Sequence, residues 1–168
     1  MNLSSMIAPE LPVHAPLIEV LHAAVFGPGA NTRAAFRLRE QGPHDLHTSF
    51  VALKDDVLVA TVRMTPIVDS TGQPGYLLGP LAVSNDWQNA GFGRALVRKA
   101  ITAANENGTA RYVLLVGDAP YYAPLGFEVC APGRVSLPGP VDPRRLLVHA
   151  LGDFDAKAVT GLVKHAGS

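Results

Sequence analysis

The spacing of hydrophobic residues changes several times along the chain, and each change marks a predicted element. Apolar residues recur at helical spacing over 17–26 before a Gly-Pro-Gly stop, which predicts a first helix. A second short helix is expected over 32–40, with Thr32 as its cap. β-Branched runs at 49–53 and 57–64 flank a short polar turn and therefore predict a hairpin.

The middle of the chain has the pattern of a strand, a long helix and a second strand. Residues 76–83 are apolar throughout, as in a strand covered on both faces, but the internal pair Gly79-Pro80 predicts a bulge or break. An amphipathic helix is expected over 91–107, followed by an apolar strand over 111–116. Such a crossover connection places its two strands parallel and near each other.

The remaining pattern predicts a β-rich end. A helical turn over 119–124, a strand from Phe127 and a last strand over 145–151 complete one predicted domain, residues 1–155. Residues 156–168 are expected to form a C-terminal tail, loose from Gly161 onward. The elements together predict a mixed α/β fold with α+β character.

Composition narrows the class of protein. The chain has 168 residues, 48% of them hydrophobic and 17% charged, which fits one globular domain and disfavours disorder. Lys+Arg and Asp+Glu both number 14, so a strongly basic nucleic-acid binder is not expected. No apolar run reaches the length of a membrane span and the first residues do not resemble a signal peptide. We therefore expect a cytoplasmic protein with neither nucleic acid nor membrane as partner.

The single cysteine, Cys130, excludes an internal disulfide framework and a zinc site built on several thiolates. It lies after a predicted strand start and no base stands beside it in the sequence. A buried structural thiol is therefore expected rather than a nucleophile.

Residues 88–94, Gln-Asn-Ala-Gly-Phe-Gly-Arg, lie at a junction between strand and helix and carry the first chemical signal. Gly91 and Gly93 allow close backbone approach, and the first N–H groups of the helix have no helical partners, which together favour an anion. Arg94 and Arg98 add charged donors. The segment is neither a Walker loop, which needs a Lys after the glycine, nor a dinucleotide fingerprint, which needs a third glycine. The alternative that the two glycines only cap and pack the helix remains open.

The context of these glycines resembles the acetyl-coenzyme A (acetyl-CoA) signature of the GNAT superfamily of N-acetyltransferases. The Gln-x-x-Gly-x-Gly follows a strand ending Leu-Ala-Val, and residues 118–127 are similar to the family's closing motif, with Tyr122 four residues before Gly126-Phe127. The order of elements matches from about residue 3 to residue 151. The resemblance implies a mostly antiparallel sheet of six to seven strands, with a parallel pair at the acetyl-CoA cleft and flanking helices.

The resemblance also implies roles for individual residues. Acetyl-CoA would be the co-substrate, with no metal, and Tyr122 the general acid that protonates the leaving thiolate; Tyr121 is the alternative donor. The pantetheine arm would pair with the backbone of the strand end, which comprises Leu81, Ala82 and Val83. The pyrophosphate would be held by the loop N–H groups, which belong to Gln88, Asn89, Ala90, Gly91, Phe92, Gly93 and Arg94.

The general base is not apparent in the sequence. Asp118 is explained equally well by a turn and Asp86 by capping of the glycine-rich helix, and His44 and His47 lie in a loop that borders the expected substrate region. A water-mediated route is therefore the default expectation.

The leading hypothesis is an acetyl-CoA-dependent N-acetyltransferase in which a small-molecule or peptide amine attacks the thioester directly. The alternative is a non-catalytic acyl-CoA sensor on the same fold, because a fold does not determine a function. The segment 27–47, with Arg37 and Arg39, is the expected lid over the acceptor. A homodimer is compatible with this fold.

Overall fold

The computed structural model describes residues 2–27 and 34–168. Within these residues the main sheet has eight strands, in the order β1-β2-β3-β4-β5-β8-β6 with β10 beside β3, and a second sheet pairs β7 with β9. The strands are β1 Ile7–Pro9, β2 Phe50–Lys54, β3 Val57–Val68, β4 Pro74–Val83, β5 Tyr112–Val116, β6 Glu128–Val129, β7 Val135–Ser136, β8 Leu146–Ala150, β9 Gly161–Leu162 and β10 Lys164–His165. The α-helices are α1 Ala15–Phe26, α2 Ala34–Arg39, α3 Phe92–Asn107 and α4 Ala119–Tyr122.

The predicted mixed α/β fold is confirmed. Strands of the main sheet pair antiparallel except β4 and β5, which run parallel with Gly75 opposite Tyr112 and Leu77 opposite Leu114. Both predicted hairpin strands form, and the predicted helices over 17–26 and 91–107 are present as α1 and α3. The expected cap Thr32 lies outside the described residues.

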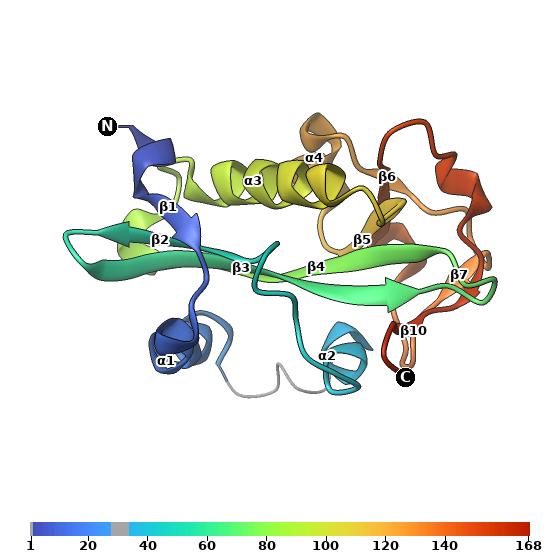
Figure 1. Ribbon diagram of the computed structural model, residues 1–168, viewed down its shortest axis with the longest axis horizontal. Coiled ribbons are helices and arrows are strands. Elements are labelled where there is room, and N and C mark those ends of the chain that lie inside the picture. Colours follow the sequence, from blue (N-terminus) through green and yellow to red (C-terminus); the bar gives the residue numbers. More distant parts are fainter. Residues whose placement is uncertain (1, 28–33) are drawn as a thin grey trace.

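The two faces of the sheet are covered by different helices (Figure 1). Helix α3 lies on one face, and α1 and α2 lie on the other. Strand β5 serves both layers, because Val113 and Leu115 join the core under α3 while Tyr112 and Leu114 join the core that includes α2. Full burial of these alternating residues explains why β4 and β5 are continuously apolar in sequence.

The predicted irregularity at Gly79-Pro80 is confirmed as a bulge in β4. Val62 of β3 pairs with Leu81, whereas Met64 pairs with Leu78, so two residues of β4 lie opposite Arg63 alone. Gly79 has φ +124° and a Cβ there would lie 2.6 Å from Nη2 of Arg39. Only glycine fits both the backbone conformation and the guanidinium packed against it.

The prediction of a loose tail from Gly161 onward is wrong. Strand β10 pairs with Val68 and Ile67 of β3, and the N–H of Val163 donates to the carbonyl of Ser136 at 2.9 Å. Val163 and His165 are buried. The added strand is also why the main sheet exceeds the six to seven strands expected. Strands β9 and β10 have two residues each, which is too short for an alternation of apolar and polar residues that would predict them.

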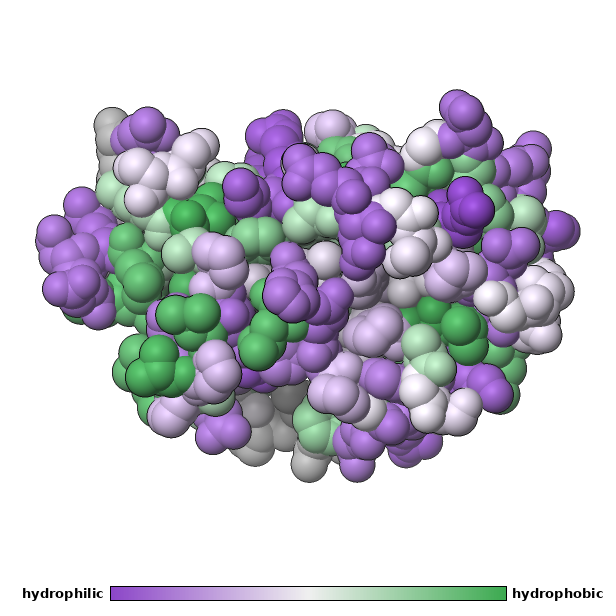
Figure 2. Space-filling model, viewed as in Figure 1, coloured by the Kyte–Doolittle hydropathy of each residue, from purple (hydrophilic) through white to green (hydrophobic). Residues whose placement is uncertain are grey.

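Part of α1 presents apolar side chains to solvent. Val13, Leu17 and Val20 follow one side of the helix and its preceding turn and are half to three-quarters exposed. Figure 2 shows apolar residues gathered over α1 at the lower left of the molecule. Across residues 2–27 and 34–168, no helix has the length and apolar character needed to cross a membrane.

Candidate active site

The parallel strands β4 and β5 separate after Leu77 and open a cavity of about 650 Å³. Leu78 to Leu81 line one side of it, and Leu115 to Asp118 line the other. Helices α1 and α2 and the segment 140–145 complete the wall. Within the described residues no strand pairs with 78–83 on the edge that β5 leaves, so this backbone edge is available for an extended ligand.

The amino end of α3 has the geometry of an anion cradle. Asn89 has φ +63° and Gly91, the N-cap residue, has φ +97°, and no side chain caps the helix. The first turn therefore presents N–H groups without helical partners. Asp86 lies in the preceding short turn and does not cap α3, so the predicted capping role is wrong.

Gly93 brings the cradle against the cavity. The Tyr121 hydroxyl occupies the position that a Cβ of Gly93 would take, and the Leu81 side chain lies 3.7 Å from that position. The Arg94 guanidinium lies 5.6 Å from the centre of the Tyr121 ring. The loop predicted to hold phosphate and the strand predicted to hold pantetheine thus meet at Tyr121.

The other residues of the two predicted binding segments have distinct positions. Phe92 is buried and packs edge-on against Trp87, so only its backbone is available to a ligand. The Gln88 side chain donates to the carbonyl of Val83 at 3.4 Å, which joins the loop to the end of β4. Ala82 is buried opposite Thr61 of β3. Asn89 is exposed and Ala90 is partly buried.

Tyr122 lines the cavity and is held by aromatic packing. Its ring lies 4.8 Å from the Tyr121 ring and 5.7 Å from the Phe127 ring, both edge-on, and it covers Gly117, where a Cβ would lie 2.6 Å away. Burial, with smaller contributions from Tyr121 and Asp118, raises the pKa of Tyr122 to about 12. The hydroxyl therefore carries its proton at neutral pH, as a proton donor must.

The sequence-based candidates for a base lie in different surroundings, and only Asp118 is at the cavity. Asp118 lies at the cavity but pairs with Arg145 at 3.5 Å, and its side chain is 77% exposed. His47 is exposed in the loop before β2. Cys130 is buried outside this cavity, and burial raises the pKa of its thiol to about 11, which fits a structural thiol.

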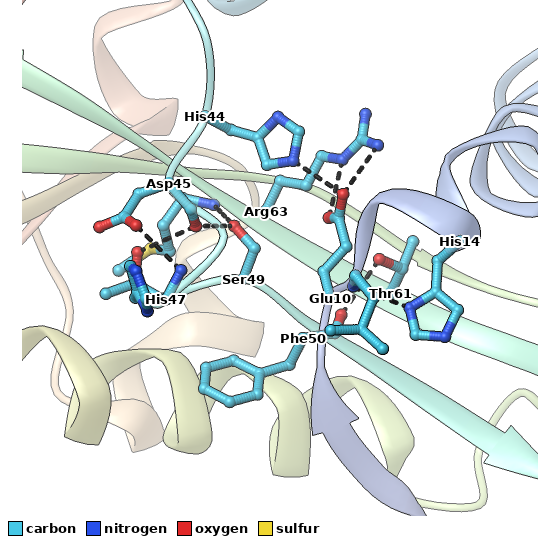
Figure 3. A network of polar contacts seen from close by, with 12 residues as sticks. Glu10, His14, His44, Asp45, His47, Ser49, Phe50, Thr61 and Arg63 are labelled. Atoms are coloured by element: carbon cyan, nitrogen blue, oxygen red, sulfur yellow. Dashed lines mark hydrogen bonds and ion pairs between the residues drawn. The ribbon is translucent and has the colours of Figure 1, made fainter.

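His44 belongs to a buried charged network instead of the cavity (Figure 3). Its Nε2 lies 2.8 Å from Oε2 of Glu10, and Arg63 contacts the same carboxylate through Nε at 3.1 Å and Nη2 at 3.2 Å. Burial alone would raise the pKa of Glu10, but the hydrogen bonds from His44 and Arg63 outweigh it and the pKa is lowered. Glu10 is 3% exposed and was not identified from the sequence.

Sequence reasoning also missed His22 as a cavity residue. It lies on α1 and lines the cavity with Arg39 of α2, which had been expected only as part of a lid. A single histidine in an amphipathic helix gives no local signal of its role. Among residues 2–27 and 34–168, no cluster of three or more His, Cys, Asp or Glu side chains could hold a metal ion.

The comparison with protein families identifies the architecture. The model of the acetyltransferase (GNAT) family matches residues 18–127. The chain belongs to the GNAT family. The match extends from α1 through the α3 loop to Phe127 and so includes both of the sequence motifs that resembled this family.

Similar proteins extend the GNAT likeness over nearly the whole chain. The protein described as uncharacterized N-acetyltransferase YhbS of Escherichia coli K12 is 33% identical over 163 residues, 95% of each chain. The crystal structure of E. coli YhbS in complex with CoA has a TM-score of 0.78 and 31% identity, covering 95% of this chain and 88% of that one. A Brucella melitensis GNAT acetyltransferase in complex with acetyl-CoA has a TM-score of 0.69, 24% identity and coverage of 96% and 97%.

Proposed function

We propose that this protein transfers the acetyl group of acetyl-CoA to a primary amine of a small molecule or peptide, by direct attack of the amine. The observation that carries the proposal is the junction of three features at one cavity. The open edge of β4 and the protonated Tyr122 line the same space, and the uncapped amino end of α3 adjoins it at Gly93, which lies against Tyr121. The GNAT relatives whose structures contain CoA or acetyl-CoA support this choice of co-substrate.

The residues present fit a CoA thioester. The backbone of Leu81, Ala82 and Val83 would pair with the pantetheine arm, because this strand edge has lost β5 as its neighbour. The N–H groups from Gln88 to Arg94 would hold the pyrophosphate, since the first turn of α3 has N–H groups without helical partners and no side-chain cap. The anion is thus bound locally in a chain with no net charge.

Tyr122 is assigned as the general acid. When bound, the co-substrate supplies an acetyl thioester whose carbonyl carbon accepts the amine. The Tyr122 hydroxyl then donates its proton to the departing sulfur, and its raised pKa makes it a protonated donor throughout the neutral range. Tyr121 is the alternative donor, but its hydroxyl is directed at Gly93 and the amino end of α3.

The test is an acetyl-CoA turnover screen across small amines, amino acids and peptide amines, with release of the CoA thiol as the readout. A thermal shift with CoA measures binding separately. Thiol release that depends on one amine class supports the transferase. A CoA-induced shift without turnover on any amine would instead establish the acyl-CoA sensor, and the absence of any shift would overturn both functions.

A further inference from the structure

His22 is a titratable group of this cavity for which the proposed reaction has no role. It lies on α1 and lines the cavity together with Phe26 of the same helix and Arg39 of α2. Its Nε2 is buried, and no residue in the described part of the chain forms a hydrogen bond with it. A buried nitrogen without a partner is costly, so such a group at a cavity wall marks a place where a ligand supplies the missing contact.

Burial keeps the His22 ring neutral, and the surrounding charges add to this effect. Burial, with smaller contributions from the cations Arg63 on β3 and Arg39 on α2, lowers the pKa of His22 to about 4, while Glu10 opposes them. A neutral imidazole retains one nitrogen that accepts a proton. The same two cations disfavour a bound ammonium, and so favour the uncharged, nucleophilic form of an acceptor amine.

We propose that His22 contacts the acceptor amine and takes the proton that this nitrogen loses during acetyl transfer. This assignment rests on the proposed transferase function. As the new N–C bond forms, the N–H bond breaks and its proton passes to Nε2. The C–S bond of the thioester breaks at the same centre, and its sulfur takes the Tyr122 proton. His22 then releases a proton to solvent and Tyr122 recovers one, which balances the cycle.

His22 can take this proton only in one tautomer, and its low basicity is sufficient. Nε2 accepts a proton only when the ring hydrogen lies on Nδ1. A nitrogen that has begun to bond to a carbonyl carbon is much more acidic than a free ammonium, so an imidazole of low pKa suffices to remove its proton.

The decisive comparison is His22→Gln against the parent, with an amine that the parent acetylates. We expect kcat to fall by about 100-fold or more, the usual contribution of a general base, while the CoA-induced thermal shift stays the same. His22→Ala should regain part of its kcat in added imidazole. His47→Gln, a change at an exposed histidine outside the cavity, should keep the parent kcat.

Several results would overturn the role of His22. A folded His22→Gln protein with kcat within twofold of the parent would do so, as would a loss confined to KM. If the substituted proteins do not fold, ring ¹H–¹⁵N spectra of the parent decide, because a hydrogen on Nε2 contradicts the proposal. A parent that binds CoA and acetylates no amine overturns the transferase function itself, together with this role.

Discussion

The two walls of the cavity between β4 and β5 are built from different chemistry. The wall formed by β4, with the amino end of α3 adjoining it at Leu81 and Tyr121, offers backbone groups, and Gly91 and Gly93 carry no side chains of their own. The wall formed by α1 and α2 offers side chains, with His22 and Arg39 at the surface and Arg63 behind them. The first is defined by one short segment of sequence, and the second by residues brought together from separate elements.

This difference matches what each wall is proposed to bind. Pyrophosphate and pantetheine are the same for every reaction with acetyl-CoA, and backbone N–H groups suffice to hold them. An acceptor amine differs from one enzyme to another, and only side chains provide that variety. The backbone wall should therefore tolerate changes in side-chain charge, whereas the side-chain wall should not.

The largest expected effect comes from Tyr122 of α4, which lines the cavity. Tyr122→Phe keeps the ring packed between Gly117 and Phe127 but removes the proton donor. Thiol release should fall by about 100-fold or more, with the CoA-induced thermal shift retained. Steady-state kinetics with one acetylated amine provides the measurement.

Tyr121→Phe is the matched control for this change, because it removes the neighbouring hydroxyl from the same short helix. It should reduce turnover much less. The reverse ranking of the two variants would transfer the acid role to Tyr121.

The second effect concerns the charged layer behind the side-chain wall. Glu10→Gln leaves the partly buried Arg63 without its anion, and removing one partner of a buried pair costs about 3 kcal/mol of unfolding free energy. Chemical denaturation at pH 7 measures it. Asp142→Asn, which breaks an exposed pair with Arg144, is the control and should leave the unfolding midpoint nearly unchanged.

The pH dependence of Glu10 has a defined sign. Its pKa in the folded protein lies below the ordinary 4.5, so its contribution to stability is present above that pH and is lost as pH falls through the lowered value. The stability gap between the parent and Glu10→Gln should therefore narrow below about pH 4.5. A gap that widens with acid would contradict the network.

The smallest effect tests the backbone wall at Gly93. Alanine usually stabilises a helix interior by about 0.5–1 kcal/mol relative to glycine. Here the new Cβ meets the Tyr121 hydroxyl, so Gly93→Ala should instead lower stability by about 1 kcal/mol. Thermal unfolding at matched concentration measures the change.

The double variant Gly93→Ala/Tyr121→Phe reverses the sign. With the hydroxyl removed, the nearest ring atom, Cζ, lies 3.7 Å from the new methyl group, an ordinary contact. The double variant should then be more stable than Tyr121→Phe alone. Destabilisation of equal size in both backgrounds would show that the hydroxyl does not limit the space at Gly93.

Local patterns were sufficient to predict most of the fold. The apolar runs at 76–83 and 111–116 and the helical period over 91–107 identified the crossover unit, and Gly79-Pro80 identified the bulge. The position of residues 161–168 was not predictable, because it depends on contacts with β3 and with the loop after α2, both distant in sequence.

The candidate site likewise has a part that could be predicted from local sequence and a part that could not. The anion cradle at Gly91 and Gly93 could be predicted from the sequence, because both glycines lie at the start of the helix whose N–H groups form the cradle. The role proposed for His22 was not visible, because its properties arise from Arg63 and Arg39, which approach it only in the folded chain. A site made of backbone groups can be recognised from one continuous segment of sequence, whereas a site made of side chains from several elements cannot.

The last strand has a consequence for how such a cavity changes during evolution. The N–H of His165 donates to the Gln41 side chain at 2.9 Å, and its Nε2 lies 2.8 Å from the carbonyl oxygen of Pro43, in the loop that leads from α2 to β2. Since α2 carries Arg39 at the cavity, we expect substitutions in β10 to move this wall without altering any residue that lines it, while the glycines of α3 stay unchanged.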